Sequence, residues 1–126
     1  MRFMMFMYPE ISDEEWNPSA EDVAEMSRYN EELRKAGMLL ALDGLHSPTE
    51  GASVSFDGEG VKAVTDGPFA EAKEVVGGYW IIQARSKDEA VEWAKRCPGR
   101  DCRIEVRRVF EMEDFPEDVQ AAVAGG

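Results

Sequence analysis

Two segments of this chain constrain its fold more than any other feature, because each is apolar at almost every position. They span residues 2–8 and 79–84. A strand with one face in water alternates apolar and polar residues, whereas a nearly continuous apolar run predicts a strand that is covered on both faces. We therefore expect both segments near the centre of one sheet, with something packed against each of its faces.

Two helices are predicted between the strands. Ser19 fits the N-cap of the first helix, with Asp22 at the capping-box position. Apolar residues then recur at helical spacing up to Gly37, the expected C′ residue: Val23, Met26, Tyr29, Leu33 and Ala36. Ser86 and Glu89 predict a full capping box for the second helix. Its inward stripe is Ala90, Trp93, Ala94 and Cys97, and Pro98-Gly99 ends it.

The remaining strands complete an α+β pattern. Residues 38–42 predict a strand, residues 53–57 and 61–65 a hairpin, and residues 103–110 a closing strand. The order strand, helix, strand, hairpin, strand, helix, strand favours a ferredoxin-like antiparallel sheet with both helices on one face. We expect a single domain over residues 1–126, with a core over about 1–111 and a C-terminal tail over 112–126 that forms a frayed helix.

This arrangement leaves the second face of the sheet without a cover, although its central strands are apolar there as well. Large exposed apolar patches are rare on soluble monomers. No third core helix is predicted that could cover the face, whereas a second copy of the same sheet could. The sequence therefore predicts a homodimer.

Charge and composition exclude several classes of function. The chain carries 14 basic and 26 acidic residues, a net charge of −12, so nucleic acid and membrane surfaces are poor partners. No run approaches the roughly 20 apolar residues of a membrane span. The apolar start lacks a signal-peptide cleavage site, and we expect a cytoplasmic protein. Two cysteines, Cys97 and Cys102, and one histidine predict reduced thiols and no structural metal. No cofactor is expected.

The densest group of chemically useful residues lies between Val64 and Tyr79. Pro68 and the glycines restrict the backbone there, so that neighbouring side chains hold defined positions. Asp66 suits a general base, or alternatively accepts hydrogen bonds within its own turn. The candidate ligand-binding residues are Phe69, Glu71, Lys73 and Tyr79. The alternative for the charged ones is a set of solvated ion pairs.

His46, the only histidine, lies in a predicted loop that follows a strand. An imidazole exchanges protons near neutral pH. If the ends of the two strands are neighbours, His46 and Asp66 form a base and its orienting carboxylate, open to a cleft with Phe69 in the wall. These two residues are the candidate catalytic pair, and the alternative is a loop histidine without a role. No hydroxyl nucleophile with a matching base and no phosphate-binding loop is recognised.

Residues 66–81 resemble the signature of the DGPF branch of the YCII-related family. The similarity extends to the apolar start, the strand at 37–40, the loop at Gly44-Leu45 and the helix that ends in Cys97-Pro98. The resemblance implies ferredoxin-like subunits in a dimeric α+β barrel. Some family members are encoded beside ECF sigma factors, which makes a sigma factor a candidate partner.

The resemblance does not settle an activity. A better-studied branch carries a proposed His–Asp pair, and in this chain Met26 and Cys97 stand at the corresponding positions. Neither side chain can do that acid–base work, so we interpret both as core residues. Three roles follow as hypotheses: small-molecule binding at the His46–Asp66 edge, a regulatory module for a sigma factor, and a cofactor-independent enzyme of the dimeric α+β barrel type.

Overall fold

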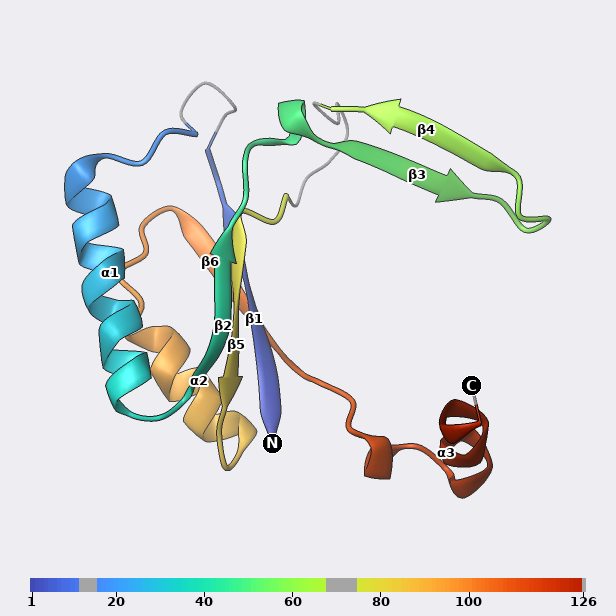
Figure 1. Ribbon diagram of the computed structural model, residues 1–126. Coiled ribbons are helices and arrows are strands. Elements are labelled where there is room, and N and C mark those ends of the chain that lie inside the picture. Colours follow the sequence, from blue (N-terminus) through green and yellow to red (C-terminus); the bar gives the residue numbers. More distant parts are fainter. Residues whose placement is uncertain (12–15, 68–74, 126) are drawn as a thin grey trace.

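The main element of the structure is a four-stranded antiparallel sheet. The computed structural model describes residues 1–11, 16–67 and 75–125. The strand order is β2-β5-β1-β6. The strands are β1 (Arg2–Pro9), β2 (Leu39–Gly44), β5 (Gly78–Gln83) and β6 (Cys102–Arg108). Helices α1 (Ala20–Lys35) and α2 (Lys87–Lys95) cover one face of this sheet (Figure 1). The predicted α+β class and ferredoxin-like arrangement are confirmed.

The helix starts follow from local hydrogen bonds. The Ser19 hydroxyl accepts from the Asp22 N–H at 3.1 Å, and the Asp22 carboxylate accepts from the Ser19 N–H at 3.4 Å, as predicted. The full capping box predicted for α2 is wrong in one half. Ser86 accepts from the Glu89 N–H, but the Glu89 carboxylate accepts from the Arg85 N–H at 3.1 Å. The Arg85 guanidinium lies 3.9 Å from that carboxylate and favours this position.

The core lies between the two helices and the sheet. Alternate residues of the central strands are buried against the helices: Phe3, Met5, Trp80 and Ile82. Helix α1 contributes Tyr29, whose hydroxyl donates to the Trp93 carbonyl at 2.8 Å, and Leu33. Met26 and Cys97 pack against this core, as predicted. Val23 was predicted to face inward but is 51% exposed, because α1 first buries a side chain at Tyr29.

The opposite side of the sheet, called here the open face, carries the intervening residues. Its apolar centre consists of Met4, Phe6, Tyr8, Tyr79 and Ile81, all partly exposed. No helix among the described residues packs on this side in Figure 1. The continuous apolar runs of the two central strands are therefore buried on one face only within a single subunit.

Two extensions leave the sheet on the side of the open face (Figure 1). The first is the hairpin of β3 (Ala52–Phe56) and β4 (Lys62–Asp66), each within one residue of the prediction. The second, called here the C-terminal arm, comprises residues 109–125. Strand β6 ends at Arg108, two residues earlier than predicted. The Arg108 guanidinium pairs with Asp114 at 2.9 Å, and the Phe110 ring stacks on that of Phe115, which turns the chain away from the sheet.

The C-terminal arm is helical in two places and tied to the sheet at its base. It contains the short 3₁₀ helix η3 (Met112–Asp114) and helix α3 (Glu117–Ala124). The Arg2 guanidinium makes two hydrogen bonds to the Glu111 carboxylate, at 2.6 and 3.1 Å. The predicted helix in the tail is confirmed. It lies away from the core, and Val123 is 53% exposed.

Candidate functional site

The loop that carries His46 is fixed by its neighbours. Leu45, directly before it, donates its N–H to the Gly77 carbonyl at 2.9 Å. The Leu45 carbonyl accepts from the Trp16 indole N–H at 3.1 Å. Both bonds lie at the end of the sheet where β2 ends and β5 begins. They fix the backbone from which His46 extends, and the imidazole itself is exposed to solvent.

The end of β4 is joined to the same loop. Asp66 is the last residue of β4 and pairs with Ala52, and its side chain is exposed. The next residue, Gly67, donates its N–H to the Gly51 carbonyl at 2.9 Å. A Cβ on Gly67 would lie 1.6 Å from the Pro48 carbonyl oxygen, so only glycine fits there. This contact gives a physical reason for the glycine that follows Asp66.

The two candidate catalytic residues thus flank the short 3₁₀ helix η2 (Pro48–Glu50). His46 precedes Pro48 by two residues, and Asp66 precedes the glycine that touches Pro48. Over residues 1–11, 16–67 and 75–125, no hydrogen bond or ion pair joins the two side chains. Their action as a pair stays a prediction. Three other predicted site residues lie outside the described residues: Phe69, Glu71 and Lys73.

Tyr79, the remaining candidate, lies on the open face of β5. Its hydroxyl donates to Asp43 Oδ2 at 2.7 Å, and this hydrogen bond raises the pKa of Tyr79. Asp43 stands opposite Tyr79 in the register of β2 and β5. Asp43 was not among the site residues predicted from the sequence, although a carboxylate at the end of a predicted strand was the available signal. The pair puts a protonated phenol and a carboxylate at the end of the open face.

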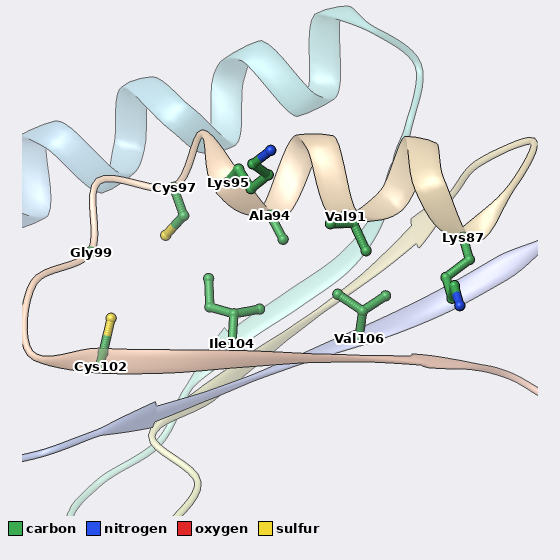
Figure 2. A pocket seen from close by; sticks show the side chains of 9 residues that line it. All are labelled: Lys87, Val91, Ala94, Lys95, Cys97, Gly99, Cys102, Ile104 and Val106. Atoms are coloured by element: carbon green, nitrogen blue, oxygen red, sulfur yellow. The ribbon is translucent and has the colours of Figure 1, made fainter.

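A groove that was not predicted from the sequence lies between α2 and β6 (Figure 2). Its volume is about 540 Å³. It is lined by Lys87, Val91, Ala94, Lys95, Cys97, Gly99, Cys102, Ile104 and Val106. Ala94 and Cys97 belong to the stripe of α2 that was predicted to face inward, and Ile104 and Val106 belong to the predicted closing strand. The structure leaves space between them, and only tertiary packing decides that spacing.

The two thiols, both free, point toward one another at one end of this groove (Figure 2). Burial raises the pKa of Cys97 to about 12 and also raises that of Cys102. A thiol must ionise to act as a nucleophile or a metal ligand. At neutral pH these two groups are protonated and serve as apolar lining.

Two features are absent from the described part of the chain. No group of three or more His, Cys, Asp or Glu side chains there is arranged to hold a metal ion. Nor is any of its helices long and apolar enough to cross a membrane.

Known proteins resemble this chain over the sheet, its helices and the hairpin. The YCII-related domain family matches residues 1–113, which include the whole sheet, α1, α2 and the hairpin. An uncharacterized protein of Rhizobium meliloti (strain 1021) is 34% identical over 84 residues, 67% of this chain. The chain spans 64% of the length of that curated relative. The family predicted from the sequence is confirmed, and this chain belongs to the YCII-related domain family.

Proposed function

We propose that this chain acts as a homodimer that binds a small molecule at the edge formed by His46 and Asp66. The observation that carries the proposal is the open face. It presents a continuous apolar centre that ends in the polar pair of Tyr79 and Asp43. A surface of this kind, apolar in the middle and polar at one end, favours a protein partner over bulk water.

A second copy of the sheet is the partner that the open face fits best. Two-fold symmetry brings each apolar residue against the same surface of the other copy, so the surface must be self-complementary. The apolar residues Met4, Phe6 and Ile81 lie in its centre, which supports this contact. The charged residues of β6, such as Arg107 and Glu105, lie toward its rim and pair at 3.5 Å. An apolar centre with a charged rim is the usual anatomy of a protein interface.

The ligand site is proposed at the end of the open face where β2 and β4 end. His46 and Asp66 supply a base and a carboxylate, and Tyr79 supplies a donor. Phe69, Glu71 and Lys73, which follow Asp66 in sequence, supply a wall and charged groups. The fixed backbone at Leu45 and Gly67 supports this choice, because a binding site gains affinity when its residues are held in advance.

The run of residues 66–81 also supports assignment of this chain to the DGPF branch of the family.

The test measures the mass of the assembled protein and identifies any small molecule bound to it. Sedimentation at micromolar concentration should give the mass of a dimer, and native mass spectrometry of gently purified protein should reveal a bound small molecule. His46→Ala should lose that molecule while keeping the dimer. The matched control is Gln83→Ala, an exposed polar residue at the other end of β5, which should retain it. A monomer, or a His46→Ala variant with unchanged ligand content, contradicts the proposal.

Two alternative roles predict different results in the same experiment. A regulatory module for a sigma factor should be a dimer without a small molecule, and its acidic surface should bind a basic segment of that factor. A cofactor-independent enzyme, incubated with the small molecule that it binds, should convert that molecule into a different product. Ligand-free dimers therefore point to the first role, and turnover points to the second.

A further inference from the structure

The hairpin of β3 and β4 has two chemically different faces. In its register Val54 pairs with Val64, and Phe56 pairs with Lys62. Residues alternate between the faces of a strand, so Val54, Phe56 and Val64 share one face, called here the apolar face of the hairpin. Ala52, Lys62 and Asp66 lie on the same face. Ser53, Ser55, Ala63 and Thr65 occupy the other face.

In the described part of the chain the apolar face is largely exposed, and the Lys62 ammonium lies 5.8 Å from the centre of the Phe56 ring. Val54 is 48% exposed, Phe56 63% and Val64 68%. The two strands pack chiefly on each other, and at their base Gly67 donates a hydrogen bond to Gly51 and lies close to Pro48. An isolated two-stranded hairpin is at best marginally stable in water and needs a further surface against its apolar side.

The direction of the hairpin indicates where that surface lies. In Figure 1 it extends on the side of the open face, and so does the C-terminal arm. Two sheets that pack face to face lie roughly 10 Å apart. A strand rises about 3.3 Å per residue, so a five-residue strand such as β3 reaches roughly 17 Å. The hairpin is therefore long enough to pass the sheet of a copy seated on the open face.

Charge favours the same occupant. The turn of the hairpin carries Asp57 and Glu59, whereas the open side of β6 carries Arg103 and Arg107. Glu105 lies between these arginines and pairs with both, at 3.4 and 3.5 Å. Two arginines and one glutamate leave this side of the strand with one net positive charge, in a chain whose net charge is −12. A second copy supplies both the apolar sheet face and the arginines. Two-fold symmetry also doubles any such contact.

We propose that the hairpin is an arm that lays its apolar face, Val54, Phe56 and Val64, against a second copy of this chain docked on the open face. The inference rests on the dimer proposed above and adds a second contact surface to it. Because the base of the arm joins the His46–Asp66 edge through Gly67 and Pro48, the proposed site of each subunit lies beside the seam between the two copies.

The test uses two double variants of equal added charge. F56D/V64D places two carboxylates on the apolar face of the hairpin, and S55D/T65D places two on its opposite face, in the same strands. Sedimentation over a range of protein concentrations gives the dimer dissociation constant of each. F56D/V64D should weaken the dimer at least about tenfold, and S55D/T65D should change it less than about twofold. An unchanged constant for F56D/V64D would overturn the inference.

A third variant separates this inference from the proposed dimer. F6D/I81D places charge at the centre of the open face. If F6D/I81D dissociates the dimer while F56D/V64D does not, the proposed dimer interface on the open face is supported and the proposed hairpin contact is wrong. A wild-type chain that is monomeric at all concentrations overturns both.

Hydrogen exchange gives a readout on the wild-type chain that needs no substitution. The amides of residues 52–56 and 62–66 should exchange more slowly as protein concentration rises and the dimer forms. If the chain dimerises but amide exchange in the hairpin does not depend on protein concentration, the proposed contact between the hairpin and the second copy is wrong.

Discussion

The two faces of the central sheet differ far more in structure than in sequence. Along β5, Trp80 and Ile82 point toward the helices and are 5% and 0% exposed. Tyr79 and Ile81, which alternate with them, lie on the open face and are partly exposed. Both sets are equally apolar. A continuous apolar run therefore shows that both faces need a cover, but only the helices of this subunit show which face already has one.

The largest expected effect tests this difference directly. Ile82→Ala removes a fully buried side chain from the helix-covered face, and we expect it to lower the free energy of unfolding by about 2–5 kcal/mol. Ile81→Ala removes the same atoms from the neighbouring position on the open face. In dilute protein, where subunits are separate, it should cost less than about 1 kcal/mol. Urea unfolding at low protein concentration measures both values.

Protein concentration sharpens the same comparison. If the open face is buried in a dimer, the cost of Ile81→Ala should grow as concentration rises, because assembly adds to apparent stability. The cost of Ile82→Ala should not depend on assembly in this way. Equal costs for the two variants in dilute protein would mean that something other than a second copy already covers the open face.

The sequence predicted the helix-covered side of the molecule better than the open side. Periodicity and capping residues identified both helices, and the two apolar runs identified the central strands. Two details that it missed depend on side-chain ion pairs. The Glu89 carboxylate accepts from the Arg85 N–H and not from the Ser86 N–H, because the Arg85 guanidinium lies close to it. Strand β6 ends early because Arg108 meets Asp114. Both contacts join residues close in sequence, four and six positions apart, but the capping and strand patterns do not include them.

The candidate site shows the same division. The strand ends that carry His46 and Asp66 were predicted from turn residues, and Gly67 was recognised as a position that restricts the backbone. Its reason, a carbonyl oxygen of Pro48 where a Cβ would lie, requires the fold. The partnership of Asp43 with Tyr79 likewise depends on the register of two strands that are distant in sequence.

A second prediction concerns the open side, where the hairpin depends on one close contact. Gly67→Ala would place a Cβ 1.6 Å from the Pro48 carbonyl oxygen, so the base of the hairpin must shift. We expect local destabilisation of about 1–3 kcal/mol. The helix-covered core should be unaffected. Faster amide exchange in residues 52–56 and 62–66, with unchanged exchange in β1, is the expected measurement.

The matched control is another glycine of the same hairpin. A Cβ on Gly58 meets nothing within 4 Å, and Gly58→Ala should stay within about 0.5 kcal/mol of the wild type. If Gly67→Ala also lowers the stability of β1, the hairpin and the core unfold together, and the two sides of the sheet are not independent.

The smallest expected effect lies on the helix-covered side, at the groove between α2 and β6. Burial raises the pKa of Cys97 from its ordinary value of 9.0 to about 12. The unfolded chain therefore loses this proton near pH 9, whereas the folded chain keeps it until about pH 12. The stabilisation is fully present below pH 9 and is lost as pH rises from 9 through 12. Urea unfolding between pH 8 and 10.5 should show this decline.

Substitution of the thiols assigns the decline to one group. Cys97→Ala should flatten the dependence on pH, and Cys102→Ala should flatten it less, because burial shifts the pKa of Cys102 in the same direction but not as far. Some decline should persist in Cys97→Ala, since burial also raises the pKa of Tyr29. An identical slope in Cys97→Ala and the wild type would mean that this thiol ionises as it does in water. The groove would then be as open as the far side of the sheet, and the contrast between the two faces would hold only for β1 and β5.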